Sequence, residues 1–441
     1  MSSRRMILAD VAAPIKNAIV GGPFGSNLVS NDYVAAGVPV IRGQNMGGRW
    51  VSGEFAYVSD EKAAQLSQNI ARPGDLVFTQ RGTLGQVSLV PSGRFDAYVV
   101  SQSQMKITVD PAKADAKYLY YLFKTPEQLQ YIFNSAIQTG VPHTNLGILK
   151  KTPILLPPLA VQSAIASIAG ALDDRIDLLR ETNATLEAIA QALFKSWFVD
   201  FDPVRAKHQG LAPAGMDDAT ARLFPDSFEE SALGLLPKDW SYGTVSDFAR
   251  IHRGSVNPGG SGGTVFEHFS LPAFDSGRMP VLELGAEIKS NKTSVPRDAV
   301  LLSKLNPHIP RVWLPVDAGP HAVCSTEFLV FVPVAGASRE FAYCSFVAAP
   351  FQERLRQLVT GTSNSHQRVK PDGIATLGAV VPSGQTLDAF TRIVRPLFER
   401  VGRNRLQAET LATLRDTLLP RLISGQLRMP DAALSEGLIT H

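Results

Sequence analysis

The stretch that decides the fold is residues 157–201, PPLAVQSAIASIAGALDDRIDLLRETNATLEAIAQALFKSWFVDF. Its apolar residues recur at steps of three and four, at Val161, Ile165, Ile168, Leu172, Ile176, Leu179, Leu186, Ala190, Leu193 and Trp197. The polar Asn183 takes the seam position between Leu179 and Leu186. Such a narrow seam is typical of a coiled coil rather than of an ordinary surface helix. A helix of about 40 residues would be about 60 Å long and needs a partner along its length.

The chain supplies that partner near its C-terminus. Residues Thr386–Leu422 have a matching apolar pattern and end before Ser424-Gly425, where glycine suits a helix C-cap. Pro396 lies inside the segment and predicts either a kink or a later start of the helix. A constant offset of 225 residues aligns the two segments, for example Leu172 with Leu397 and Leu193 with Leu418.

The regions before the two helices also repeat. Residues 1–156 contain short β-branched runs at 37–43, 75–82, 86–90 and 98–109, followed by helical patterns at 117–124 and 127–137. Residues 241–382 follow the same plan: Val100-Ser101 aligns with Cys324-Ser325, and His143 with His366. A repeat of this length indicates two copies of a globular domain, each followed by a helix.

We therefore predict a mixed α/β (α+β) fold with two repeated globular domains and two long helices packed as an antiparallel coiled coil, related by a pseudo-twofold axis. The predicted parts are 1–156 (first domain), 157–201 (first long helix), 202–240 (connector), 241–382 (second domain), 383–425 (second long helix) and 426–441 (tail). A pseudo-twofold arrangement suits duplex DNA. About 30 residues of helix overlap would hold the domains about 45 Å apart, so that the helix pair acts as a ruler.

Composition narrows the class of protein. The 441 residues carry a formal net charge of +3 and are 44% hydrophobic, enough for sizeable cores. Residues 1–158 hold 15 basic and 10 acidic side chains, whereas residues 159–240 hold 7 and 13. The two cysteines show no metal spacing, no signal peptide is evident, and no run of 18 apolar residues occurs. We expect a reduced, cytoplasmic protein without a membrane span.

Enzyme motifs are weak. There is no phosphate-binding loop with lysine, and Gly21–Ser26 (GGPFGS) is either a backbone nest for phosphate or a plain turn. The eight histidines are scattered, which predicts no metal site. Asp275 with Glu287-Ile288-Lys289 resembles a nuclease triplet, but we interpret it as chance, with the latter residues on a solvated strand edge. Residues 259–263 match G-x-S-x-G formally and are interpreted as a flexible glycine-rich loop.

Loop side chains suited to base edges occur in both domains. In the first domain the candidates are Arg42, Gln44, Asn45, Gln80, Arg81, Thr83, Gln102, Gln104, His143 and Asn145. In the second they are His252, Arg253, Lys304, Asn306, His308, Arg311, Glu327, Asn364, His366 and Arg368. Arginine reads guanine, asparagine and glutamine read adenine, and glutamate accepts from cytosine. Better candidates for phosphate contacts are Arg49, Arg94, Lys150, Lys151, Arg339 and Lys370.

Several stretches together carry a resemblance to a known family. They are GGPFGSNL (21–28), GVPVIRGQNM (37–46), GDLVFTQRGTLGQVSLVP (74–91), SQSQMKITVD (101–110), LPPLAVQSAIASIAGALDDRIDLL (156–179), LFKSWFVDFDPV (193–204) and LFPDSF with LGLLPKDW (223–240). With them the chain resembles the DNA-specificity subunit of a type I restriction-modification system, a host-defence complex that also methylates DNA.

The resemblance implies two target-recognition domains that each read half of a bipartite DNA site, and a helix pair that sets the spacer. It implies docking of two DNA methyltransferase subunits and of restriction (motor-nuclease) subunits. It implies no catalytic residue and no cofactor on this chain, with S-adenosylmethionine, ATP and Mg on the partner subunits.

The two halves differ in two places. The second domain has the glycine-rich NPGGSGGTVFEH (257–268) and no clean counterpart of RGTLGQ, and the second helix is arginine-rich with Asn404 on its seam. We therefore expect the domains to read different sequences, so that the site is asymmetric. The alternatives are a single-chain restriction or methylation enzyme, and a scaffold whose two domains bind protein.

Overall fold

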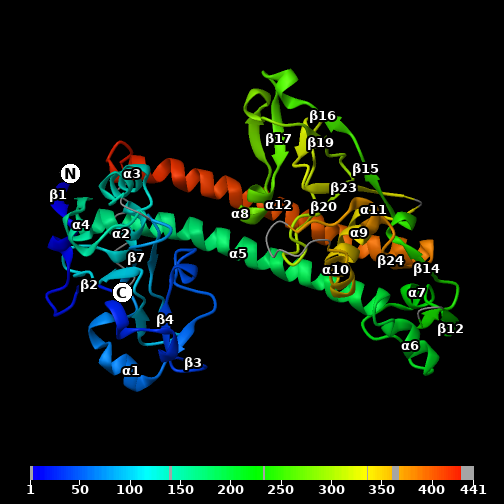
Figure 1. Ribbon diagram of the computed structural model, residues 1–441, viewed down its shortest axis with the longest axis horizontal. Coiled ribbons are helices and arrows are strands. Elements are labelled where there is room, and N and C mark those ends of the chain that lie inside the picture. The colour runs from blue at the N-terminus through cyan, green and yellow to red at the C-terminus, as the bar shows by residue number, and fades with distance from the viewer. Residues whose placement is uncertain (1–2, 139–141, 232–233, 335, 360–366, 429–441) are drawn as a thin grey trace. The chain divides into compact units, whose positions relative to one another are not determined.

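The computed structural model describes residues 3–138, 142–231, 234–334, 336–359 and 367–428 (Figure 1). The chain forms two compact units, unit 1 from residues 1–177 and 409–441, and unit 2 from residues 178–408. Two 40-residue helices, α5 (Leu159–Phe198) and α12 (Gly384–Ile423), each contribute to both units. They cover the two segments in which the heptad-like seams predicted long helices.

Unit 1 is built on two small sheets. One is antiparallel with strand order β2-β10-β7-β8, from β2 (Ile19–Gly21), β7 (Leu76–Thr79), β8 (Val87–Leu89) and β10 (Gln104–Ile107). The other has the order β3-β5-β4-β9-β6, from β3 (Tyr33–Val34), β4 (Val38–Ile41), β5 (Ala56–Val58), β6 (Ile70–Ala71) and β9 (Tyr98–Val100), with β4 and β9 parallel. A third pair joins β1 (Arg4–Ile7) to β11 (Pro153–Leu156).

Four short α-helices complete the described part of unit 1: α1 (Asp60–Gln65), α2 (Ala116–Leu122), α3 (Pro126–Ser135) and α4 (Leu146–Lys151). Helix α3 begins at Pro126, where the missing N–H of proline is harmless. Helix α2 is buried along most of its length, and its core cluster includes Ile165 of α5 and Leu419 of α12. The main core of unit 1 therefore includes residues from both long helices.

Unit 2 repeats this plan. Its antiparallel sheet has the order β15-β23-β20-β21, from β15 (Ala249–His252), β20 (Val300–Ser303), β21 (Val312–Trp313) and β23 (Phe328–Pro333). Its second sheet has the order β16-β19-β22-β17-β18, from β16 (Ser255–Val256), β17 (Val265–Phe269), β18 (Val281–Leu284), β19 (Lys292–Ser294) and β22 (Ala322–Cys324), with β17 and β22 parallel. Strand β14 (Ser241–Thr244) pairs with β24 (Gly378–Val381), as β1 does with β11.

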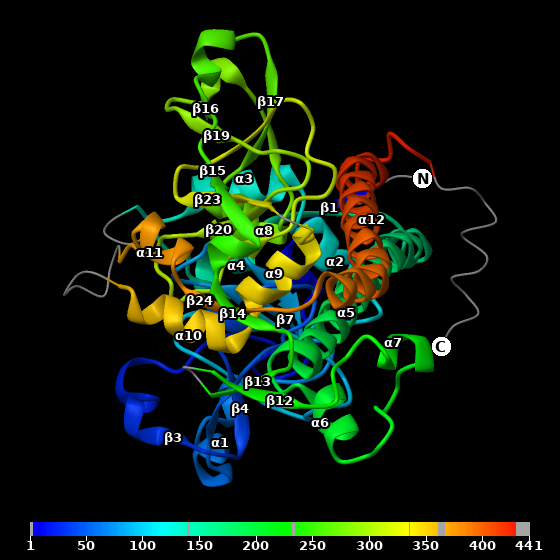
Figure 2. The same ribbon diagram turned by 90° about the vertical axis from the view of Figure 1, so that its right-hand side faces the viewer.

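The helices of unit 2 outside the long pair are α6 (Asp202–His208), α7 (Asp218–Ala221), α8 (Leu271–Gly277), α9 (Arg339–Val347), α10 (Ala349–Gln357) and α11 (Pro371–Ala375). The predicted connector contains α6, α7 and the hairpin of β12 (Phe228–Ser231) and β13 (Gly234–Pro237). The core of unit 2 is aromatic. Phe198 of α5 packs edge-on against Phe390 of α12 and Phe341 of α9, with ring centroids 5.1 Å and 5.3 Å apart. The stretches of α5 and α12 that belong to unit 2 lie side by side in both views (Figures 1 and 2).

Within each unit the long helices are joined by polar contacts. In unit 1, Asp173 of α5 pairs with Arg415 of α12. In unit 2, Asn183 and Phe194 of α5 contact Asn404 and Phe390 of α12, respectively. The position on α12 falls as that on α5 rises, so the pairing is antiparallel, as predicted.

Several local predictions need correction. Helix α12 starts at Gly384, so Pro396 does not mark a later start. The run 98–109 is two strands, β9 and β10, in different sheets, with a turn at 101–103 between them. Glu287 lies in the 3-10 helix η8 (Gly285–Glu287) rather than on a strand edge. Residues 258–261 form a 3-10 helix, η7, so the G-x-S-x-G match does not lead into an α-helix.

A buried amide pair lies on the helix seam in unit 2. Asn404 Nδ2 donates to Asn183 Oδ1 at 2.8 Å, and Asn183 Nδ2 donates to the Val401 carbonyl at 3.3 Å. Asn404 is 1% exposed and Asn183 is 8% exposed. A polar pair at this depth fixes register, because sliding either helix would leave both amides unpaired.

We predict that Asn404→Ala lowers the free energy of unfolding by about 1–3 kcal/mol, because Asn183 then keeps a buried oxygen without its donor. The double variant Asn183→Leu/Asn404→Leu should regain that stability, since both polar partners are gone. Urea unfolding followed by circular dichroism measures this, with the exposed Gln407→Ala on α12 as a neutral control. A double variant less stable than Asn404→Ala would contradict the pairing.

Candidate nucleic-acid interface

Three loops of unit 1 meet at the end of β7. The Gln80 amide donates to the Ser103 carbonyl at 2.7 Å, and the Thr144 amide donates to the Gln80 carbonyl at 3.0 Å. Arg81 forms an isolated antiparallel bridge with His143. Main-chain bonds therefore join the segment after β7, the turn between β9 and β10, and the segment before α4.

These loops bring together a subset of the predicted readers. Arg81, Thr83 and Gln102 are exposed, whereas Gln80 and His143 are half-buried. Gln44 is also exposed, on the 3-10 helix η4 (Gly43–Asn45), where its Nε2 donates to the Glu54 carbonyl at 3.2 Å.

Three other candidates of unit 1 support the backbone instead. Asn45 is buried, accepts from the Arg42 amide at 3.0 Å and donates to the Ser52 and Glu54 carbonyls. Gln104 is fully buried and pairs through Oε1 with the Ser101 hydroxyl, and Asn145 caps α4 through the Ile148 amide at 2.9 Å. Asn45 is 1% exposed and Gln104 0%, so a reading role for either would require the surrounding loop or strand to open. Half-buried Arg42 is the N-cap of η4.

Unit 2 has the same main-chain framework. The Lys304 amide donates to the Glu327 carbonyl at 3.0 Å, and the Val369 amide donates to the Lys304 carbonyl at 3.0 Å. Leu305 bridges Arg368 as Arg81 bridges His143. The counterpart of His143 is therefore Arg368, which corrects the predicted match with His366. His366 and Asn364 lie outside the described residues.

In unit 2 several candidates line one hollow of about 430 Å³. His252 and Arg253 reach it from the end of β15, Lys304 from the end of β20, and Lys292 from β19. The cationic groups of Arg253, Lys292 and Lys304 outnumber the one carboxylate in the lining, that of Asp372, and favour an anionic ligand. His252 Nε2 lies 2.8 Å from the Ser294 hydroxyl.

Lys292 is absent from the sequence-based candidates. Its side chain is nearly buried, and Nζ donates to the carbonyl and the hydroxyl of Ser290 at 3.0 Å and 2.7 Å. Burial lowers the pKa of its ammonium group, against the opposing charge of Glu283. The one available signal was a lysine inside a β-branched run, Lys292-Thr293, which is unusual on a buried strand.

Ion pairs already engage other candidates of unit 2. Arg311 donates to both carboxylate oxygens of Asp275 at 2.8 Å, which lowers the pKa of that carboxyl. Arg368 holds Glu327 in the same forked way, at 2.9 Å and 3.2 Å. Arg311 therefore fixes α8 to the segment before β21, and its guanidinium is engaged there instead of being available to bind guanine. The Arg368–Glu327 pair stays at the surface, where DNA can compete for either member.

Of the remaining candidates of unit 2, some have exposed side chains and one shapes the backbone of its loop. His308 is exposed, and Arg253 makes a 3.4 Å surface contact with Asp372. Asn306 has a left-handed φ of 51°, and its amide donates to the Gln367 carbonyl at 2.8 Å. Asn306 therefore shapes the loop.

Two of the predicted phosphate contacts are structural. Arg49 donates to the Gly170 carbonyl on α5 at 3.1 Å and pairs with Asp174. Arg339 donates to the carbonyls of Arg297 and Pro315 at 2.8 Å and 3.2 Å. Arg94 stacks on aromatic rings, whereas Lys150, Lys151 and Lys370 are exposed, and their contact with phosphate stays a prediction.

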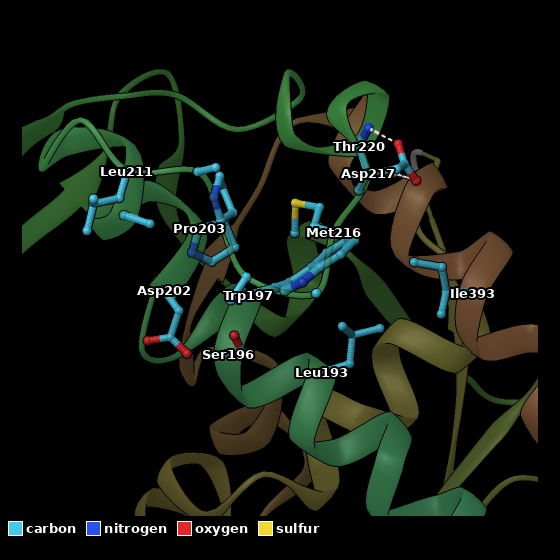
Figure 3. Close-up of a pocket in the computed structure, with 15 residues that line it drawn as sticks. Leu193, Ser196, Trp197, Asp202, Pro203, Leu211, Met216, Asp217, Thr220 and Ile393 are labelled. Carbon is cyan, nitrogen blue, oxygen red and sulfur yellow. Dashed lines mark hydrogen bonds between the residues drawn. The ribbon is translucent and has the colours of Figure 1, made fainter.

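Another hollow, of about 590 Å³, lies elsewhere, between α5, α6, the connector and α12 (Figure 3). Its walls are mostly apolar, including Leu193, Trp197 and Met216. Asp217 caps α7 through the Thr220 amide at 2.8 Å, and this bond lowers the pKa of the carboxyl. No paired acid and base faces this hollow.

Neither a metal-binding cluster nor a membrane-spanning helix is found among the described residues. No group of three or more histidine, cysteine or acidic side chains is arranged to hold a metal ion among those residues. Among the described helices none is long and apolar enough to cross a membrane.

Comparisons with known proteins agree on one family. The model of the type I restriction modification DNA specificity domain matches residues 27–188. The MjaIX specificity subunit of a type I restriction enzyme from Methanocaldococcus jannaschii is 23% identical over 434 residues, which cover 94% of this chain and 92% of that protein. The HindI specificity subunit from Haemophilus influenzae is 25% identical over 406 residues, covering 81% and 87%. A crystal structure of the type I S subunit from M. genitalium shares the fold, with 14% identity, a TM-score of 0.53 and coverage of 98% and 97%.

Residues 27–188 thus match the DNA specificity domain, most of the chain is similar to type I specificity subunits, and the fold is shared with one solved S subunit.

The two cysteines offer a direct test for nucleophilic chemistry. Cys324 and Cys344 are buried, and burial raises the pKa of Cys324 to about 12 and that of Cys344 well above its usual value. A thiol nucleophile acts as the thiolate, so neither group is reactive near neutral pH. We predict no reaction of the native chain with Ellman's reagent at pH 8 and release of two equivalents after unfolding in urea. A native thiol that reacts within minutes would contradict this placement.

Proposed function

We propose that this chain is the non-catalytic, sequence-reading subunit of a type I restriction-modification complex. Each unit reads one half of a bipartite DNA site, through the loops after β7 in unit 1 and after β20 in unit 2. The observation that carries the proposal is the shared main-chain framework at these two places. It presents Gln80, Ser103 and His143 in unit 1, but Lys304, Glu327 and Arg368 in unit 2.

Different side chains on one framework favour an asymmetric site. The glutamine and arginine of unit 1 suit adenine and guanine edges. The lysines, arginine and glutamate of unit 2 suit guanine, cytosine and phosphate. We expect the half-sites to differ accordingly.

In this proposal the partner subunits carry out the catalytic steps. Two DNA methyltransferase subunits and the restriction subunits would supply S-adenosylmethionine, ATP and Mg, and the complex would act on chromosomal DNA in the cytoplasm. The curated relatives, which are themselves named specificity subunits, support a chain without catalysis of its own.

The test is co-expression with a candidate methyltransferase partner, followed by genome-wide mapping of methylated adenines. We expect a bipartite motif with the partner and no methylation by the chain alone. Calorimetry should detect no binding of S-adenosylmethionine to the isolated chain. Methyl transfer by the purified chain would show a single-chain enzyme, and a co-expressed pair that selects no sequence would favour the protein-binding scaffold.

A reciprocal exchange tests which loops read. We predict that Gln80→Lys changes only one half of the mapped motif and Lys304→Gln only the other, because the two residues occupy equivalent positions. Lys304→Gln should also lower the dependence of log Kd on log salt by about 1 if its ammonium contacts phosphate. The exposed Lys238→Gln, outside the loops, is the matched control. An exchange that leaves both halves unchanged would contradict the assignment.

Helix length should set the spacer between the half-sites. We predict that removing seven residues from each of α5 and α12 shortens the recognised spacer by about three base pairs, since seven helical residues rise about 10 Å. Methylation mapping again reads the result, and the half-site bases should not change. Altered half-sites with an unchanged spacer would count against the ruler.

A further inference from the structure

One aromatic side chain of unit 1 lies almost wholly in solvent. Phe24 is 90% exposed, more than any other large hydrophobic side chain in the described part of the chain. Single exposed apolar residues are common, so exposure alone carries no conclusion. The hydrogen bonds that hold its loop, and the position of that loop beside the reading loops of unit 1, indicate a role for Phe24.

The backbone before Phe24 is fixed by a close approach. The Gly22 amide donates to the Gln104 carbonyl at 2.8 Å. A Cβ added at Gly22 would lie 1.9 Å from the Ser101 carbonyl oxygen, so only glycine fits there. Because this amide is bonded within the chain, the segment favours a tight turn over the phosphate nest that its glycines also suggested.

The backbone after Phe24 is clamped by a predicted reader. Gln102 Nε2 donates to the Gly25 carbonyl at 2.6 Å and to the Leu28 carbonyl at 3.0 Å. Gly25 has a φ of 58°, the left-handed region that favours glycine. The loop therefore presents the phenyl ring from a backbone fixed on both sides, which lowers the entropy lost on binding.

The held loop borders the reading loops of unit 1. Gln102 stands on the turn whose Ser103 carbonyl accepts from the Gln80 and Arg81 amides. A Cβ at Gly21 would lie 3.8 Å from Gln80 Oε1. The sequence contains no acidic residue between Asp10 and Asp32, so the segment does not repel a polyanion.

We propose that Phe24 is an apolar wedge that inserts at a base step of the duplex beside the base edges read from Gln80 and Arg81. The inference rests on the proposed function of unit 1. A phenyl ring can cover the face of any base, and wedges of this kind open a step so that neighbouring side chains reach their edges. The wedge would position the DNA, while the polar loops choose the bases.

The experiment uses the full chain in complex with its methyltransferase partner and a duplex carrying the mapped site. 2-Aminopurine replaces adenine at successive positions of the unit 1 half-site, and its fluorescence rises where a base is unstacked. We expect a rise at one step with the wild type and with Phe24→Trp, and no rise with Phe24→Ala. Affinity should fall about 5- to 100-fold in Phe24→Ala. The salt dependence should stay the same, because the ring carries no charge.

The matched control is Ile15→Ala, which removes a 57% exposed apolar side chain at the other end of β2, and it should bind as the wild type does. Unchanged affinity and fluorescence in Phe24→Ala would overturn this inference alone. Loss of methyltransferase binding without DNA would also overturn it, by showing a protein anchor. A wild-type complex that selects no sequence would overturn the proposed function itself.

Discussion

Each unit depends on a carboxylate of α5 that is shared between helix α12 and the globular part of the unit. In unit 1, Asp173 accepts from the Tyr121 hydroxyl at 2.7 Å and pairs with Arg415. In unit 2, Glu187 pairs with Arg405 of α12 and with Arg278 at 3.0 Å. Removing one partner would leave a poorly solvated charge, so these contacts specify one arrangement of helix and domain even where their net contribution to stability is small.

The physical surroundings of these contacts agree with that role. Burial lowers the pKa of Arg405, and the charge of Glu187 opposes that shift. Burial raises the pKa of Tyr121, so its hydroxyl stays protonated and donates. These contacts fix both long helices and so give the reading loops a rigid support. If a long helix were displaced, all the loops of that unit would move together with it.

The sequence predicted the features that depend on periodicity. Apolar steps of three and four identified α5 and α12, and the offset of 225 residues matched the two helices to each other. Matching short motifs in residues 1–156 and 241–382 identified the repeated domains, because periodicity and repetition are both visible in the sequence itself. Features that depend on tertiary hydrogen bonds leave no such pattern in the sequence. Asn45 and Gln104 have side chains suited to reading bases, yet both are buried, Asn45 where it bonds the Ser52 and Glu54 carbonyls and Gln104 within strand β10. Lys292 went unnoticed because only the packing of β19 brings it to the hollow with Lys304.

The division between scaffold and reader explains how one fold can serve different targets. The bonds that join the loops, from Gln80 to Ser103 in unit 1 and from Lys304 to Glu327 in unit 2, use only main-chain atoms. Side chains at these positions can therefore change without a loss of loop geometry. At the equivalent position, unit 1 carries the amide of Gln80 and unit 2 the ammonium group of Lys304. Where a side chain itself holds the loop, as Asn45 and Arg311 do, substitution costs stability and the position is less free to vary. Specificity is thus expected to change most easily at the residues whose backbones, rather than side chains, hold the domain together.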